Sequence, residues 1–433
     1  MTTWSLASAL LLAISTQALD GRAIATVPHS LMSYATRPVL ASETIANTQG
    51  DPIATDAIAT MLKELQQAGL TNPEQGVWIQ SHDGAIAAGR LSNRPISSAS
   101  LTKSATTLAA LQRWGSNHRF ITNIRTTGKV VGDTLKGDLW IEGGGDPLFV
   151  WEEAIALGNK LNQLGIKRVQ GNLIITGNFA MNFQADYSES ASLLRLAFDS
   201  SQWEGEVATQ YATMAAGTPK PQLVITGSNL YSPKLSDNSQ ILIRHSSLPL
   251  WQIIKRMNTF SNNDMAEMLA EQLGGGKQVA AIASQATGIP PDEIKLINGS
   301  GLGQANQISP RANVAILMEV HNRAQVEGLT LADLYPVSGC KCGTIEQRGL
   351  PKGAIVKTGT LSDVSAVEGI IQTQKYGAVW FAIVNRGEGN IDTFHQSQDR
   401  MLQNLVSKWG LPKLPNASFV ETPWRDSDRN TTP

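Results

Sequence analysis

Residues 98–114 read SASLTKSATTLAALQRW, a polar start followed by a segment with helical spacing. Ser100 lies three residues before Lys103, which is close to one helical turn, so the two side chains share a face. A serine beside a lysine fits a nucleophile with its base, but it also fits an ordinary polar helix start. The S-x-x-K spacing alone does not separate these interpretations, because about one match is expected by chance in such a chain.

The composition is that of a folded protein with more than one domain. The chain has 433 residues, of which 42% are hydrophobic and 16% are charged, and this length is enough for two or three domains. A net charge of −1 without a long basic run argues against nucleic acid as a partner. The six histidines form no H-E-x-x-H motif and no pair at ligand spacing, so no metal site is expected from them.

An apolar run at the N-terminus predicts export. Residues 1–15 read MTTWSLASALLLAIS, which is too short to span a bilayer but fits the apolar region of a signal peptide. Ala23-Ile24-Ala25 supplies an A-x-A cleavage pattern, so residues 1–25 are expected to be a signal peptide. The protein is then periplasmic or otherwise extracytoplasmic, with no stable membrane span. A buried N-terminal helix is the alternative interpretation of the same run.

Two cysteines, Cys340 and Cys342, are separated by one residue. Two thiols cannot complete a zinc site, and this spacing is poor geometry for a relaxed disulfide. We interpret them as local packing or as a strained redox pair, and we expect no catalytic role for them.

The hydrophobic pattern changes twice along the chain. Residues 53–69 have helical periodicity, and VWIQSHDGAIAAGR at 77–90 reads as two short strands around an Asp-Gly turn. From 120 to 231 short alternating segments are broken by Gly and Asp, which indicates a β-rich block. Helical runs return after residue 248, followed by further strands and a final helix. The pattern predicts an α+β core interrupted by a β-rich domain.

A second motif, Lys357-Thr358-Gly359, follows an apolar strand in AIVKTGTLS. A strand that ends in a cation, a hydroxyl and a residue without a side chain can present its edge to an extended substrate. The lysine and threonine would bind a carboxylate, and the glycine would leave room for it. A charged residue that simply ends a strand is the plain alternative.

The third element is an S-x-N motif, for which the sequence contains two candidates. Ser236-Asp237-Asn238 lies in a polar stretch between two expected strands, where such residues usually form a turn. Ser261 and Asn263 instead lie where one amphipathic helix ends and another begins, so their side chains can project into a cleft. We therefore select Ser261 and Asn263 and regard Ser236 as a decoy.

The order S-x-x-K, S-x-N, K-T-G is the signature of active-serine penicillin-recognising enzymes. With it, the chain resembles the D-alanyl-D-alanine carboxypeptidase/endopeptidases, the class C low-molecular-mass penicillin-binding proteins. The resemblance covers most of residues 75–410 and includes GDLWIEGGGDP, NGSGLGQANQISP, VSGCKCGTIEQR and KTGTLSDVSAVEGII. Asn298 stands where the family usually has Asp, and SAS replaces the usual PAS before the lysine.

The resemblance implies a domain plan. The fold would be a transpeptidase core of the penicillin-binding-protein and β-lactamase type, an antiparallel sheet flanked by helices, with a β-rich insertion between Ser100 and Ser261. The expected divisions are residues 1–25 signal peptide, 26–118 first part of the core, 119–235 inserted domain, 236–413 second part of the core and 414–433 polar, disordered tail.

The resemblance also implies roles for the motif residues. Ser100 would attack the carbonyl between two D-alanines, with neutral Lys103 as its base. Ser261 would pass the proton to the departing nitrogen, and Asn263 would bind the substrate amide.

The third motif and the residue after it would bind the rest of the substrate. Lys357 and Thr358 would bind the terminal carboxylate, and Gly359 would leave room for it. The backbone N–H groups of Ser100 and Thr360 would form the oxyanion hole. No metal or organic cofactor would be needed.

The expected function is a serine-type D-Ala-D-Ala carboxypeptidase, or also a DD-endopeptidase, acting on peptidoglycan stem peptides. β-Lactam antibiotics would be covalent inhibitors. A β-lactamase shares the same catalytic residues and is one alternative. A non-catalytic peptidoglycan-binding protein that keeps the fold is another.

Overall fold

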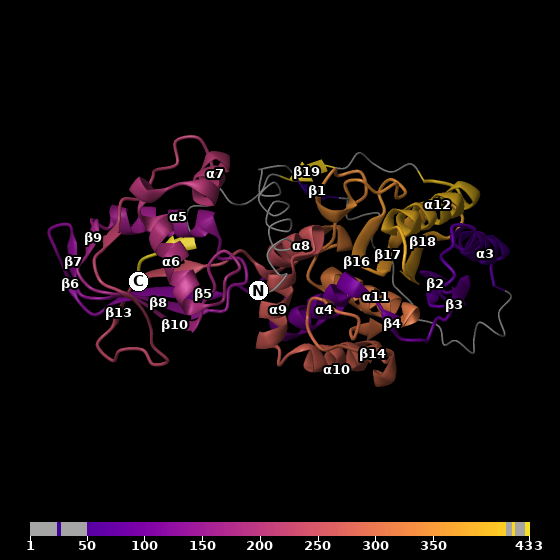
Figure 1. The fold of residues 1–433 in the computed structure, drawn as a ribbon, viewed down its shortest axis with the longest axis horizontal. Helices are drawn as coiled ribbons and strands as arrows, with labels where there is room; N and C mark the ends of the chain where they lie inside the picture. Colours follow the sequence, from indigo (N-terminus) through magenta and orange to yellow (C-terminus); the bar gives the residue numbers. More distant parts are fainter. Residues whose placement is uncertain (1–23, 27–49, 413–417, 421–428) are drawn as a thin grey trace. The chain divides into compact units, whose positions relative to one another are not determined.

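The computed structural model describes residues 24–26, 50–412, 418–420 and 429–433. Residues 1–23 of the expected signal peptide lie outside this range. The described chain divides into two compact units (Figure 1). We call residues 118–249 with 429–433 the inserted unit, and the remaining described residues the main unit.

The main unit is built on a five-stranded antiparallel sheet in the order β16-β17-β18-β2-β3. Its strands are β2 (Gln75–Ser81), β3 (Ala87–Arg90), β16 (Ile355–Leu361), β17 (Val364–Thr373) and β18 (Gly377–Arg386). The central strands β17 and β18 are almost continuously buried, because both of their faces are covered.

Two helices that are far apart in sequence cover one face of this sheet. They are α3 (Pro52–Gln67) and α12 (Ile391–Trp409), which pack side by side (Figure 1). Met61 and Leu65 of α3 and Phe394 and Leu402 of α12 join one core with the sheet residue Phe381. Asp51 caps α3 by accepting a hydrogen bond from Ala54 N at 3.0 Å.

The other helices of the main unit surround α4 (Thr102–Trp114), which follows the single turn η2 (Ala99–Leu101). Every residue of α4 from 102 to 111 is buried, and the hydroxyls of Ser104, Thr106 and Thr107 have hydrogen-bond partners there. Its helical neighbours are α8 (Leu250–Phe260), α9 (Asn263–Gln272), α10 (Gly276–Thr287) and α11 (Pro310–Val326). A small sheet of β4 (Ile96–Ser97), β14 (Ile294–Lys295) and β15 (Gln307–Ile308) lies beside them.

The remaining described elements of the main unit are short. They are β1 (Ile24–Thr26), η4 (Pro291–Glu293), η5 (Leu331–Asp333), η6 (Gly343–Ile345) and β19 (Ser418–Val420). β1 pairs with β19 and contains two residues of the expected cleavage pattern.

The inserted unit contains two sheets. The larger has the order β12-β10-β8-β5-β13-β20 and the smaller β11-β9-β7-β6. The strands are β5 (Ile121–Thr126), β6 (Lys129–Val131), β7 (Thr134–Lys136), β8 (Leu139–Gly144), β9 (Arg168–Val169), β10 (Leu173–Asn178), β11 (Val224–Ile225), β12 (Asn229–Tyr231), β13 (Gln240–Ser246) and β20 (Asn430–Thr431).

Helices are a larger part of the inserted unit than the term β-rich suggests. They are α5 (Trp151–Gln163), α6 (Tyr187–Phe198), η3 (Ser200–Gln202) and α7 (Gly205–Thr213). β8 and β10 are parallel, and β10 is also parallel to β12. Parallel neighbours need a crossover, which α5 and α6 provide.

Two expected boundaries differ from the observed units. The inserted unit continues to Pro249 rather than ending at 235, because β13 pairs with β5 along most of its length. The expectation of a disordered tail is wrong for residues 429–433, since β20 pairs with β13. Residues 413–417 and 421–428 of the same segment lie outside the described range.

Cys340 and Cys342 form a disulfide with their Cα atoms 5.2 Å apart. Of the two interpretations made from the sequence, local packing of free thiols is therefore wrong. Lys341 between them has a φ of +48°, and this turn brings the two side chains to bonding distance despite the short spacing.

Candidate active site

Ser100 and Lys103 lie at the entry to α4, where the chain makes a sharp turn. Ala99 has a φ of +47°, an uncommon conformation for a residue with a side chain. The turn places Ser100 in η2 and Lys103 in the first turn of α4, with Lys103 Nζ 3.0 Å from Ser100 Oγ. The structure thus brings the two residues of the S-x-x-K motif into contact.

Lys103 is completely buried and has three hydrogen-bond partners. Besides Ser100 Oγ, they are Asn263 Oδ1 at 2.7 Å and the carbonyl oxygen of Ser300 at 2.8 Å. Burial lowers the pKa of Lys103 well below its usual value, and the nearby charge of Lys357 lowers it further. Lys103 therefore has access to the neutral form that a base requires.

Ser261 and Asn263 lie at the junction of α8 and α9, as expected. Ser261 has a φ of +53°, which ends α8 abruptly and turns the chain into α9. Asn262 caps α9 by accepting a hydrogen bond from Met265 N at 2.8 Å. The capping is thus done by the middle residue of the motif, and the Asn263 side chain bonds Lys103 instead.

Lys357 brings the third motif to the same place. Its Nζ donates to Ser261 Oγ at 2.9 Å and to the carbonyl oxygen of Thr358 at 2.7 Å. The side chain is completely buried, and this lowers its pKa to about 7 although the charge of Glu368 acts in the opposite direction. Hydrogen bonds thus join Lys103 to Ser100 and Asn263, and join Lys357 to Ser261. The two groups are close enough for the charge of Lys357 to act on Lys103.

Gly359 lets β16 lie directly against the turn that carries Ser100. A Cβ atom at this position would be 2.7 Å from the carbonyl oxygen of Ser98 and 2.9 Å from the backbone nitrogen of Ser100. No side chain fits there, so the requirement for glycine is steric. Thr360, the next residue, is exposed on β16, which is an edge strand of its sheet.

A buried carboxyl group, Glu368, lies behind the site, and sequence reasoning missed it. Glu368 of β17 lies opposite Lys357 of β16 in the strand pair. Its carboxyl group accepts a hydrogen bond from Ser104 Oγ, and Ser104 Oγ in turn accepts one from the Tyr335 hydroxyl at 3.1 Å. Burial raises the pKa of Glu368 to about 8. The signal was present in AVEGII, where one acidic residue interrupts an apolar strand.

The loop that supplies the Ser300 carbonyl was also missed as a functional element. The Glu267 carboxylate accepts hydrogen bonds from Gly299 N at 2.9 Å and Ser300 N at 3.0 Å, which orients the loop. Asn298 accepts from Gly301 N at 3.0 Å, so it closes the loop in the position where an aspartate is usual. The repeated Gly and Ser of NGSGLG was the available signal.

The rejected motif lies elsewhere. Ser236 belongs to the inserted unit, where its carbonyl oxygen accepts a hydrogen bond from Ser239 N at 2.9 Å in a turn.

In the part of the chain that the structure describes, no group of three or more His, Cys, Asp or Glu side chains is placed to bind a metal. Likewise, no described helix is long and apolar enough to cross a membrane.

A family model for the D-Ala-D-Ala carboxypeptidase 3 (S13) family matches residues 45–189 and 223–406, which is most of the chain. The chain belongs to the S13 family. The gap in the match, 190–222, lies within the inserted unit and contains α7.

Among curated proteins, the chain is similar to D-alanyl-D-alanine carboxypeptidase DacB of Haemophilus influenzae, with 28% identity over 166 residues, 34% of each chain. The match thus spans about a third of that curated relative. Among solved structures, a predatory peptidoglycan endopeptidase from Bdellovibrio bacteriovorus is similar with a TM-score of 0.70 and 21% identity, over 83% of this chain and 98% of the other.

The same Bdellovibrio endopeptidase has been solved acylated by penicillin G and bound to an immunity protein. This structure matches with a TM-score of 0.68 and 22% identity, over 80% of this chain and 95% of the other. These structural likenesses establish that the S13 member described here has the mixed helix and sheet fold expected from its sequence.

Proposed function

We propose that this protein is a serine-type D-Ala-D-Ala carboxypeptidase that acts on peptidoglycan stem peptides through an acyl-enzyme on Ser100. The observation that carries the proposal is the contact between Ser100 Oγ and the buried Lys103 Nζ at 3.0 Å. A lysine buried without a carboxylate bonded to it is expensive unless it is neutral, and a neutral amine is a base.

The contacts of Lys103 match those of a neutral amine. Its two N–H bonds would point to Asn263 Oδ1 and to the carbonyl oxygen of Ser300, both of which can only accept. The nitrogen lone pair would then face the hydroxyl of Ser100. In this arrangement Ser100 loses its proton to Lys103 as Oγ attacks the peptide carbonyl.

The second lysine would bind the end of the substrate and assist the leaving group. Protonated Lys357, together with Thr358, would attract the terminal carboxylate of the peptide. Ser261, which accepts from Lys357 Nζ, would pass a proton to the departing D-Ala nitrogen. Asn263 would bind the substrate amide.

The backbone N–H groups of Ser100 and Thr360 would stabilise the oxyanion. Gly359 supports this step, because it permits β16 to lie close to Ser100 N. Water then cleaves the acyl-enzyme, so that one water is consumed for each D-Ala released.

Labelled penicillin tests the assignment of the nucleophile. We expect wild type to form a covalent adduct and Ser100→Ala to form none, because the attacking oxygen is lost. Ser236→Ala is the matched control and should label like wild type, since Ser236 lies in a turn of the inserted unit. An undiminished adduct in Ser100→Ala would overturn the assignment.

Two kinetic assays separate the remaining possibilities. Release of D-Ala from a pentapeptide is expected of a carboxypeptidase, whereas rapid turnover of a chromogenic cephalosporin would indicate a β-lactamase. Binding of the pentapeptide without hydrolysis would indicate a non-catalytic protein. Digestion of purified sacculi, with identification of the released muropeptides, distinguishes carboxypeptidase from endopeptidase action.

The substrate also suggests the location. Peptidoglycan lies outside the cytoplasmic membrane, so we propose an extracytoplasmic or periplasmic site of action, in agreement with the signal peptide expected at residues 1–25. β-Lactams would act as covalent inhibitors, and the structurally similar endopeptidase has been solved acylated by penicillin G.

A further inference from the structure

The loop of residues 339–347 contacts two parts of the candidate site at once. Thr344 Oγ1 lies 2.7 Å from Thr358 Oγ1, the hydroxyl proposed to bind the substrate carboxylate. Next to it, Gly343 packs so tightly on the end of α8 that a Cβ atom would overlap the carbonyl oxygen of Thr259. Thr259 lies two residues before Ser261, so the loop contacts both the carboxylate-binding strand and the S-x-N junction.

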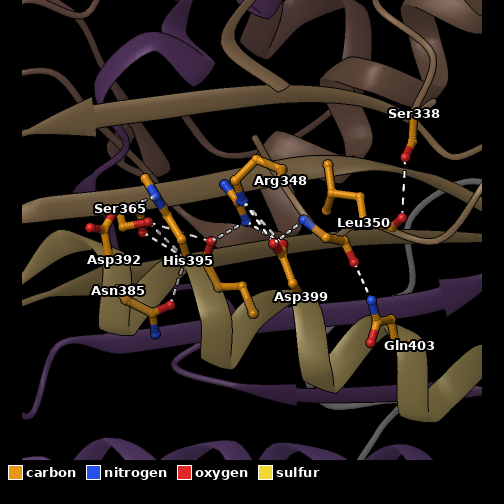
Figure 2. A network of polar contacts seen from close by, with 11 residues as sticks. Ser338, Arg348, Leu350, Ser365, Asn385, Asp392, His395, Asp399 and Gln403 are labelled. Atoms are coloured by element: carbon orange, nitrogen blue, oxygen red, sulfur yellow. Dashed lines mark hydrogen bonds and ion pairs between the residues drawn. The ribbon is translucent and has the colours of Figure 1, made fainter. Parts of the chain in front are cut away.

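This loop is fixed to the main unit on both sides. Before it, Ser338 Oγ donates to the carbonyl oxygen of Leu350 at 3.2 Å. After it, Arg348 forms an almost buried ion pair with Asp399 of α12 at 2.7 Å, and Gly349 N donates to the same carboxylate at 2.7 Å (Figure 2). The part in between is therefore a closed loop with fixed ends.

The disulfide between Cys340 and Cys342 determines the path of the chain inside this loop. Lys341 between the cysteines has a φ of +48°, which is unfavourable for a residue with a side chain, and Gly343 follows with +56°. Such a conformation persists only when its surroundings enforce it. Here the ring closed by the disulfide enforces the conformation of Lys341. The ring ends at Cys342, which is one residue before Gly343 and two before Thr344.

We propose that Thr344 is a positioning residue for Thr358, and that the Cys340–Cys342 disulfide holds it there, so that substrate binding depends on the redox state of this pair. The inference rests on the proposed function, because it assigns Thr358 to the substrate carboxylate. Thr344 can take up one of the two hydrogen-bonding directions of the Thr358 hydroxyl and thereby orient the other toward the carboxylate.

The redox step is an ordinary thiol–disulfide exchange with a dithiol. One thiolate of the reductant attacks a sulfur of the pair, and its second thiol resolves the mixed disulfide. Two electrons and two protons pass to Cys340 and Cys342, which become thiols, while the dithiol becomes a disulfide. Both cysteines are half-buried rather than enclosed, so a small dithiol can reach them.

Thr344 is tested by a pair of substitutions. Thr344→Val keeps the shape but removes the hydroxyl, and we expect KM for a D-Ala-D-Ala peptide to rise about fivefold with kcat little changed, the effect of losing about 1 kcal/mol. Thr344→Ser restores the hydroxyl and should restore KM. A role in folding alone would lower the amount of active enzyme rather than KM, and an unchanged KM in Thr344→Val would overturn the assignment.

The disulfide is tested by assaying wild type before and after dithiothreitol, with the two thiols counted. The chain contains no other cysteine, so an effect of the reductant on the protein arises from this pair. We expect reduction to raise KM two- to fivefold. Cys340→Ser/Cys342→Ser should show the raised KM permanently and no longer respond to dithiothreitol.

Coupling between the two sites supplies the sharpest criterion. In Thr344→Val, reduction should add little to KM, because both changes remove the same hydrogen bond. Additive effects, or an unchanged KM in wild type with two titrated thiols, would overturn the inference. Failure of the proposed function is a separate result, since then oxidised wild type would neither form the penicillin adduct nor release D-Ala.

Discussion

At the scale of single residues, the site depends on two buried lysines whose environments differ. Lys103 is hydrogen-bonded to the Ser100 hydroxyl and to two oxygens that can only accept, Asn263 Oδ1 and the carbonyl oxygen of Ser300. Lys357 instead lies opposite Glu368 of the neighbouring strand. Burial is the main cause of the lowered pKa of both lysines. The charge of Lys357 lowers the pKa of Lys103 further, whereas the charge of Glu368 raises the pKa of Lys357, which is why Lys103 is proposed as the base and Lys357 as the cation.

This pair predicts a bell-shaped dependence of kcat/KM on pH. Activity should rise on the acid side as Lys103 loses its proton, and fall on the alkaline side as Lys357, with a pKa of about 7 in the free enzyme, loses the charge that attracts the carboxylate. Glu368 has a pKa of about 8 and therefore ionises over the same pH range, where its negative charge raises the pKa of Lys357. Glu368→Gln removes this charge and should move the alkaline limb to lower pH. The acid limb should stay in place.

The matched control for Glu368→Gln is Glu319→Gln, which removes a carboxylate paired with Arg323 at the helix surface. Its pH profile should equal that of wild type. An alkaline limb that does not move in a folded Glu368→Gln protein would contradict the assignment of Lys357.

At the scale of elements, the site depends on how closely β16 approaches the turn before α4. Gly359 lies against Ser98 O and Ser100 N, and Gly301 of the neighbouring loop lies against the carbonyl oxygen of Ala99. Both contacts are between backbones, which cannot give way as side chains can. The turn that carries Ser100 is therefore enclosed by two segments that approach it at glycines.

Gly359→Ala is accordingly expected to slow acylation by labelled penicillin at least tenfold, because its Cβ would displace the turn that carries Ser100 by several tenths of an ångström. The measurement is the rate of adduct formation, with far-UV circular dichroism as the check on folding. Gly349→Ala is the control, since its Cβ would meet its nearest neighbour at an ordinary 3.5 Å. Equal rates for the two variants would contradict the steric account.

At the scale of the whole molecule, the last described residues complete the inserted unit. Arg429 forms an ion pair with Glu153 of α5 at 2.6 Å, and both side chains are nearly inaccessible to water. His245 of β13 lies 3.6 Å from the same carboxylate and 2.9 Å from Asn430 Oδ1. Burial lowers the pKa of His245, so at neutral pH Arg429 is the charge that balances Glu153.

Arg429→Met should therefore lower the free energy of unfolding of the inserted unit by about 3–5 kcal/mol, the usual effect of leaving one buried charge unpaired. Urea unfolding at neutral pH measures the change. Thr431→Ala, which alters an exposed residue of the same strand, is the control and should stay within about 0.5 kcal/mol of wild type.

Penicillin labelling under native conditions should persist in Arg429→Met, because Ser100 belongs to the main unit. A free energy of unfolding within about 1 kcal/mol of wild type would show that the Glu153 charge is balanced in another way.

The sequence by itself was enough to predict the family and the α+β core, because three short motifs in a fixed order are specific in combination although each is common alone. It also predicted that the motif side chains meet, and Ser100, Lys103 and Asn263 do lie in contact. The local hydrophobic pattern was sufficient to select Ser261 and Asn263 rather than Ser236, because a junction between two amphipathic helices and a polar turn differ in hydrophobic periodicity.

Only the tertiary structure decided the features that depend on distant parts of the chain. Three such features are the pairing of β20 with β13, the carboxyl group of Glu368 opposite Lys357, and the hydrogen bond between Thr344 and Thr358. Each joins segments through strand pairing or packing. The lowered pKa values of Lys103 and Lys357 also depend on distant parts of the chain. Their pKa values follow from burial and from neighbouring charges, and both are properties of the folded chain.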